Sequence, residues 1–307
     1  GSVHVCYEAG FCGYALARAI RSWGYDCVIA ATTSIPRKPN RKKKTDRMDA
    51  EILARALRDG GIEKVYIPEE EEDAIRGLVR CRMTFRKEIK RTKYRITAFL
   101  HTRGHIYTDG KPWTQKHRTW VRSLPLLPHD QTTLTNYLMM MTFLEARLTL
   151  LEEEMETIAA SPDYKDRVGR LSCFRGIDLI TAMVIIAEIV DFTRFPNAPS
   201  FMDFVGLVPG IWASGDKEVY LETTGAGNTY VRTLLVEAAW HYRHIPRIGI
   251  RLARRQQGYP MDLLQSSWNA QQRLYRTYRR LAHKKGPHKA ITAVARELAG
   301  FVWNAMQ

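Results

Sequence analysis

Two long stretches of heptad-like apolar spacing constrain the fold of this 307-residue chain more than any other feature. The first follows an acidic run at residues 69–73, and its apolar side chains recur at coiled-coil spacings, with Arg82 and Thr92 filling the remaining seam positions. The apolar seam residues are Ile75, Leu78, Phe85, Ile89, Ile96 and Phe99. Because acidic side chains suit the positive end of a helix dipole, we predict a long helix that begins near Glu69.

The second stretch shows the same alternation of four-residue and three-residue steps. Its members are Tyr137, Met141, Leu144, Leu148, Leu151, Met155 and Ile158. This pattern predicts either the return arm of a helical hairpin or a dimer contact. Further helices are predicted after the breaker at residues 161–163, over residues 180–189, 230–242, 268–281 and 288–305.

The start of the chain has a different periodicity. Apolar runs at residues 3–7 and 26–31 flank an amphipathic stretch at residues 14–23, which predicts a βαβ unit with parallel strands. Buried parallel strands need helices on both faces, and one strand pair alone is visible, so we expect that a segment is missing upstream. The predicted fold class is therefore α/β plus mostly α, in three parts: 1–68, 69–160 and 161–307.

Composition favours a polyanionic partner. Lys and Arg outnumber Asp and Glu by 47 to 32, which gives a formal net charge of +15 and a pI near 9.7. Such a balance is typical of nucleic-acid-binding proteins, although a basic but otherwise ordinary soluble protein or a membrane-surface protein remains open. The chain lacks both an apolar run of 18 residues and the organisation of a signal peptide, so no membrane partner is expected.

The five cysteines form no Cys-x-x-Cys pair, which indicates reduced thiols in a cytoplasmic protein and no zinc site.

Three carboxylates suggest a magnesium site. Glu8 ends the first predicted strand, and Asp46 and Asp49 are spaced i, i+3 on one face of a predicted helix capped by Thr45. Hard oxygen ligands of this kind hold Mg²⁺ and polarise a phosphodiester. The basic run Arg41, Lys42, Lys43 and Lys44 comes directly before them and suits a phosphate-rich substrate. A capped helix after a basic loop is the simpler alternative.

Two glycine-bounded segments stand out in the C-terminal part. Residues 174–182 resemble a helix-hairpin-helix element, in which turn amides and the next helix N-terminus hold a DNA phosphate, although Gly176 could equally just separate two helices. Ser214 lies on a predicted exposed turn between Gly210 and Gly215, where a nucleophile or an ordinary hydrogen-bonding serine would both fit. The loop at residues 223–228 could cradle a further phosphate.

Five sequence blocks, taken in order and spacing, resemble the DEDD transposases of bridge-RNA-guided insertion sequences. The blocks are residues 7–10, 44–50, 206–209, 213–215 and 234–240. The resemblance implies a RuvC-like (RNase-H-like) metal-binding domain, here partial, then a long coiled-coil arm and a helical transposase domain with a nucleophilic serine. It implies that Glu8, Asp46 and Asp49 are the last three of four acidic Mg²⁺ ligands and that Ser214 is the nucleophile. The first acid has no counterpart here.

The resemblance also implies a mechanism and partners. Ser214 would attack a DNA phosphodiester to form a transient phosphoserine link, and the partners would be target and donor DNA, a structured guide (bridge) RNA, and further copies of the chain in a dimer or tetramer. The cations that we expect to contact nucleic acid are Arg41, Lys42, Lys43, Lys44, Arg82, Arg86, Lys90, Lys93, Arg175, Lys217 and Arg232.

Two other functions remain open at this point. One is a RuvC-like metal-dependent nuclease or junction resolvase, in which water is the nucleophile and Ser214 is structural. The other is a non-catalytic RNA- or DNA-binding fragment with an incomplete metal site.

Overall fold

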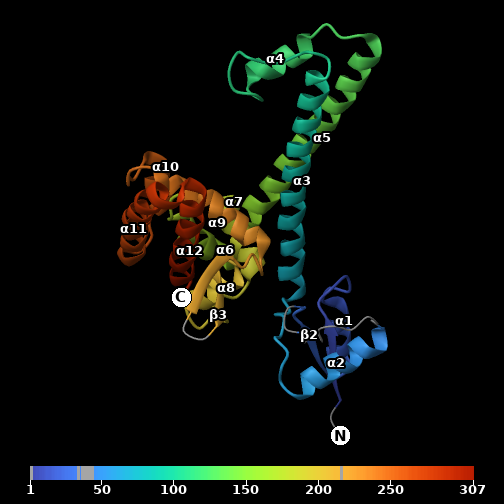
Figure 1. The fold of residues 1–307 in the computed structure, drawn as a ribbon, viewed down its shortest axis with the longest axis vertical. Coiled ribbons are helices and arrows are strands. Elements are labelled where there is room, and N and C mark those ends of the chain that lie inside the picture. Colours follow the sequence, from blue (N-terminus) through green and yellow to red (C-terminus); the bar gives the residue numbers. More distant parts are fainter. Residues whose placement is uncertain (1–2, 33–34, 36–44, 215–216) are drawn as a thin grey trace. The chain divides into compact units, whose positions relative to one another are not determined.

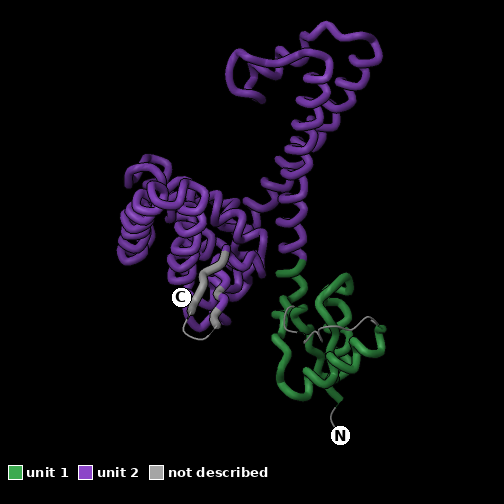
Figure 2. The backbone as a smooth tube through the Cα atoms, in the orientation of Figure 1, with its two compact units in different colours: residues 1–73 green, residues 74–307 purple. Residues whose placement is uncertain are grey.

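The computed structural model describes the chain except for residues 1–2, 33–34, 36–44 and 215–216. Helices dominate, and the described strands are short (Figure 1). The chain forms two compact units, residues 1–73 and 74–307 (Figure 2). This division does not test the predicted three-part organisation, which separates the two long helices from the C-terminal part.

The first unit contains the predicted βαβ arrangement. Strands β1 (His4–Glu8) and β2 (Asp26–Ala30) pair in parallel, with His4 opposite Asp26 and Glu8 opposite Ala30. Helix α1 (Ala15–Ser22) connects them, and helix α2 (Asp46–Arg58) follows and contacts β1. Ala17, Ile20, Cys27 and Ile29 form a small buried cluster. The observed register confirms the predicted parallel pairing. The helix that connects the two strands packs its apolar side chains against them, as a parallel connection requires.

Two long helices open the second unit. Most of α3 (Glu70–His101) and all of α5 (Pro128–Ala159) belong to it, and the short helix α4 (Gln115–Ser123) lies between them in sequence. The long helices run antiparallel, because ion pairs join Arg82 to Glu152, Lys93 to Glu145 and Arg103 to Asp130. The two helices lie side by side (Figure 1).

The predicted seam of α3 is partly confirmed. Five of its positions are buried: Ile75, Arg82, Ile89, Thr92 and Ile96. Near the α4 end the seam widens into a separate apolar cluster. The members of this cluster are Ile96, Leu100, Val121, Leu134 and Met141. The pattern therefore predicted the long helix and its buried face, and a true coiled coil stays a prediction.

The larger core of the second unit lies in its C-terminal helices. They are α6 (Pro162–Ser172), α7 (Leu179–Ile189), α8 (Ala198–Phe204), α9 (Thr229–Ala239), α10 (Ile250–Gln256), α11 (Met261–Lys285) and α12 (Pro287–Ala305), with a 3₁₀ turn at Trp240–Arg243. Helix α7 is buried along residues 182–189, and α12 contacts α6, α8, α9 and α11. An antiparallel hairpin, β3 (Pro209–Ser214) and β4 (Lys217–Thr223), interrupts the helices.

The helices predicted from residue 180 onward are all present, with ends that differ by a few residues. The largest difference is α11, which begins at Met261 rather than Trp268, directly after Pro260. Proline has no N–H and favours the first turn of a helix or the position before it, so Pro260 was the available signal. No helix in the described ranges is long and apolar enough to cross a membrane.

Candidate functional site

The three predicted metal ligands lie on neighbouring elements of the first unit. Glu8 ends β1 and is exposed, while Asp46 and Asp49 occupy the first turn of α2. The Thr45 side chain accepts a hydrogen bond from the Met48 amide (3.4 Å) and so defines where this helix begins. Helix α2 contacts β1, which brings both sources of carboxylate to one part of the unit.

The donor chemistry of these residues fits a hard divalent cation, because carboxylate oxygens are the ligands that Mg²⁺ prefers. The geometry is less complete. Within the residues that the structure describes, no three His, Cys, Asp or Glu side chains gather in a group that could hold a metal ion. The three acids therefore share a region without forming a finished cage, and their metal role stays a prediction. The predicted phosphate contacts Arg41, Lys42, Lys43 and Lys44 lie outside the described residues.

The predicted nucleophile lies at the far end of the β3–β4 hairpin. Ser214 is the last residue of β3 and pairs with Lys217, the first residue of β4. The structure describes the backbone of these two residues and not their side chains. Six residues of β3 place Ser214 about 17 Å from the root of the hairpin at Pro209. The predicted exposed turn is thus a strand end at the hairpin tip.

The root of this hairpin is held by close backbone contacts. The Asn228 amide donates to the Phe204 carbonyl (3.1 Å). A Cβ on Gly227, whose φ is +78°, would lie 1.9 Å from the same Phe204 carbonyl oxygen. The Arg232 guanidinium donates to the carbonyls of Val205 (3.0 Å) and Ala226 (2.9 Å). Arg232, predicted as a nucleic-acid contact, therefore connects the two chain segments at the hairpin root.

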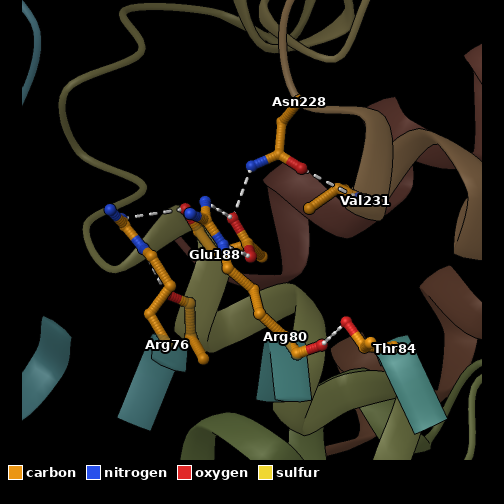
Figure 3. A network of polar contacts seen from close by, with 7 residues as sticks. Arg76, Arg80, Thr84, Glu188, Asn228 and Val231 are labelled. Carbon is orange, nitrogen blue, oxygen red and sulfur yellow. Dashed lines mark hydrogen bonds and ion pairs between the residues drawn. The ribbon is translucent and has the colours of Figure 1, made fainter. Parts of the chain in front are cut away.

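A buried carboxylate fastens this root to the long helix α3. Glu188, whose side chain is fully buried, accepts two hydrogen bonds from Arg80 on α3 (2.6 and 2.8 Å). It also accepts one from Asn228 Nδ2 (2.8 Å), while Asn228 Oδ1 accepts from the Val231 amide and caps α9 (Figure 3). Arg76 donates to the Glu188 carbonyl oxygen (3.2 Å). Residues distant in sequence thus meet at one side chain.

This network was missed by sequence reasoning. Its signal was present, because Glu188 is the only charged residue of α7 (Leu179–Ile189), whose other residues are apolar except for Thr181. A carboxylate buried in such a helix needs a cationic or hydrogen-bonding partner. Its partners come from α3 and from the residue before α9, however, and no local spacing in the sequence connects those positions.

The glycine turn between α6 and α7 is tightly packed. Gly176 has a φ of +85°, and a Cβ there would lie 2.6 Å from the Ala238 carbonyl oxygen, so this position requires glycine. Asp178 caps α7 by accepting a hydrogen bond from the Thr181 amide (2.8 Å). The Arg175 guanidinium donates to the backbone carbonyl of Ile245 (3.0 Å). The predicted helix, turn and helix are therefore present.

The cations that we predicted along α3 have mixed surroundings. Arg82 is buried and binds Glu152, and Lys93 Nζ lies 3.8 Å from Glu145, so both stabilise the pairing of α3 with α5. Arg86 and Lys90 are exposed, which leaves them accessible to a polyanion. The geometry favours a structural role for the first two and a surface role for the second two.

Comparison with known proteins gives two matching family models. The family described as "Transposase IS116/IS110/IS902 family" matches residues 169–252, and a DEDD transposase family of the IS110 type matches residues 2–103. The two matches cover the predicted serine-bearing region and the predicted acidic region separately.

Individual relatives are similar over most of the chain. A putative transposase, y4qE, of Sinorhizobium fredii is 39% identical over 98% of this chain and 74% of its own length. The transposase for insertion sequence element IS1533 of Leptospira borgpetersenii is 32% identical over 92% of this chain and 83% of its own length. The transposase for insertion sequence element IS1111A of Coxiella burnetii is 24% identical over 65% of this chain and 55% of its own length.

Proposed function

This chain belongs to the IS116/IS110/IS902 family of DEDD transposases, and on that premise we propose that Ser214 is its nucleophile in DNA strand exchange. Family membership makes the protein a DNA transposition enzyme. The observation that carries the finer proposal is the β3–β4 hairpin, which places Ser214 at its tip while the root is fixed to α8, α9 and α3. A serine at the tip of a hairpin whose root is held in place can reach a DNA duplex and be positioned for attack.

The proposed step is a transesterification at a DNA phosphodiester. The bond from Ser214 Oγ to phosphorus forms while one P–O bond to deoxyribose breaks, and the displaced deoxyribose oxygen gains a proton as the serine hydroxyl loses one. The covalent link retains the energy of the phosphodiester, so attack by the displaced oxygen of another strand can rejoin DNA without an external energy source. Two or more copies of the chain would be needed to cut and exchange both strands.

We further propose that Glu8, Asp46 and Asp49 hold a divalent cation, Mg²⁺, when DNA is bound. Oxygen donors on β1 and on the first turn of α2, which contact each other as elements, support this assignment. A cation there would supply charge stabilisation for the phosphate. In the same proposal, the phosphates of the DNA backbone are contacted by Arg86, Lys90 and the basic run at residues 41–44. A structured guide RNA would select the target by base pairing.

The test uses the full chain with labelled donor and target DNA, Mg²⁺ and RNA transcribed from the flanking non-coding sequence of the element. Products are separated on a denaturing gel. The expected result is a protein–DNA adduct that is sensitive to protease and absent in Ser214→Ala. Ser123→Ala, which removes an exposed hydroxyl bonded only to the Trp120 carbonyl among described contacts, is the matched control and should retain the adduct.

Other outcomes assign the alternatives. Cleavage without an adduct, unaffected by Ser214→Ala, would identify a hydrolytic RuvC-like nuclease and overturn the serine mechanism. Binding to DNA and RNA without any cleavage would identify a non-catalytic nucleic-acid-binding protein.

Metal binding is measured separately, by isothermal titration calorimetry of Mg²⁺ in the presence of DNA. Glu8→Gln and Asp49→Asn should each abolish the metal-dependent heat if the acids hold the ion.

A further inference from the structure

A cationic cleft lies beside the turn between α6 and α7. It has a volume of about 590 Å³, and it is lined by the turn at Arg175 and Gly176, by His241, and by the segment that leads into α10. Four of its lining residues are arginines, namely Arg175, Arg247, Arg251 and Arg255. All of these residues belong to the second unit of the chain.

The described residues do not balance the charge of this cleft. Its one acidic lining residue, Asp178, already accepts a hydrogen bond from the Thr181 amide as the cap of α7. In the described part of the chain, no carboxylate lies within ion-pair distance of any of the four arginines. Four guanidinium groups against one carboxylate give the cleft an excess of three positive charges.

Two of these guanidinium groups are also partly removed from water. Burial lowers the pKa of Arg175, and it also lowers the pKa of Arg255. Arg255 donates through Nη1 to the Ile177 carbonyl, while its buried Nε has no hydrogen-bond partner in the described residues. Desolvated cations and an unpaired donor are costly unless an anion reaches them. This is the physical signature of a site that an anion completes.

The cleft is also held in shape before any ligand arrives. Arg175 donates to the carbonyls of His244 (3.3 Å) and Ile245 (3.0 Å) and lies 3.4 Å from Gln271 Oε1, which also accepts from the Arg247 amide (3.1 Å). Gln271 is 1% exposed, so this connection is internal. The positive N-terminal end of α7 faces the same turn and adds a favourable field for an anion.

We propose that this arginine cleft binds a backbone phosphodiester of the DNA substrate. Guanidinium groups bind phosphate oxygens through paired, charge-assisted hydrogen bonds, and several convergent arginines with one carboxylate favour a phosphate over a neutral ligand. The assignment to DNA rests on the proposed function, because transposases of this family act on DNA. The cleft would hold the DNA in position and leave bond breaking to another part of the protein.

The test measures equilibrium binding of the full chain to a fluorescent DNA duplex by anisotropy over a range of salt concentrations. Arg247→Gln and Arg251→Gln remove exposed arginines of the cleft, so both variants should fold. Arg254→Gln is the matched control, since it removes an exposed arginine of the same helix α10 that does not line the cleft. Circular dichroism melting checks that all three retain the parent fold.

We expect Arg247→Gln and Arg251→Gln each to weaken duplex binding about tenfold, and the double variant to lower the salt-dependence slope by about 2. The control should change affinity less than threefold, because it loses only long-range attraction. Equal losses in the cleft variants and in Arg254→Gln would overturn the proposal, as would no loss in any of them. A loss confined to a single-stranded RNA probe, with duplex DNA binding intact, would overturn the assignment to DNA.

To separate this proposal from the serine mechanism, duplex binding by the cleft variants is also measured in the Ser214→Ala background. If the cleft variants still bind the duplex more weakly, but the parent chain forms no protein–DNA adduct, the cleft proposal holds and the serine mechanism fails. If the parent chain forms the adduct, but the cleft variants bind the duplex as tightly as the parent, the serine mechanism holds and the cleft proposal fails.

Discussion

Replacing Arg80 with methionine should destabilise the second unit sharply, because it strands a buried carboxylate. Glu188 has a fully buried side chain. Among the described residues its carboxylate accepts three side-chain hydrogen bonds, two from Arg80 and one from Asn228, so the substitution leaves it with the one from Asn228. Breaking one side of a buried ion pair costs about 3–5 kcal/mol. The Arg80 side chain is 44% exposed, so water can enter its place, and we expect a loss near the lower limit, about 3 kcal/mol.

The matched control is Arg86→Met on the same helix. Its side chain is 45% exposed, nearly the same as that of Arg80, but its nearest carboxylate is Glu237 at 4.0 Å, which is itself 58% exposed. An ion pair of this kind contributes about 0–1 kcal/mol. Both variants remove one arginine from α3, so the difference between them isolates the effect of the buried carboxylate.

The assay is thermal unfolding followed by calorimetry and by tryptophan fluorescence. For a unit of this size, about 3 kcal/mol corresponds to a fall in Tm of roughly 6–12 °C. Adding Glu188→Gln to Arg80→Met should recover at least half of the loss, because glutamine can still accept from Asn228 without carrying a charge. The reasoning is refuted if Arg80→Met costs no more than Arg86→Met, or if Glu188→Gln restores nothing.

Two further predictions concern the hairpin root and the thiols. Gly227→Ala should destabilise the protein by more than about 2 kcal/mol, because its Cβ would lie 1.9 Å from the Phe204 carbonyl oxygen. Gly225→Ala is the control: its φ is also positive, but its Cβ would come no closer than 4.0 Å to the Thr223 carbonyl oxygen, so it should cost about half as much in a melting assay. In native protein at pH 8, iodoacetamide should modify the exposed Cys81 and spare Cys173, because burial raises the pKa of Cys173 to about 11 and covers the sulfur; equal modification of both by mass spectrometry would contradict this.

Local signals in the sequence predicted most of the secondary structure. The three- and four-residue spacing from Ile75 to Ile96 predicted a long helix with one buried face. Two short apolar runs on either side of an amphipathic stretch predicted a parallel βαβ start. Both patterns report which residues of an element are buried, and each can be recognised from residues that are close together in the chain. For the same reason the glycine turn at Gly176 could be located from its sequence.

Long-range partners could not be predicted in this way. Arg82 occupied a seam position and was also expected to bind nucleic acid, but only the structure shows its partner, Glu152 on α5. The arginine cleft likewise joins Arg175 to Arg251 across 76 positions, and neither residue has a spacing that points to the other. Such pairings depend on how helices cross, which is set by the packing of the whole unit.

The long helix α3 couples distance and direction within the second unit. From Ala74 to His101 the helix advances about 1.5 Å and turns about 100° with each residue. The apolar cluster near α4 is therefore separated from the larger core by a stiff spacer whose length is set by residue count. One inserted residue would barely lengthen this spacer, yet it would rotate the surface around α4 by more than a quarter turn. Inserting or deleting seven residues in each of the two long helices would change the length of this spacer by about two helical turns and leave the surface around α4 facing nearly the same direction.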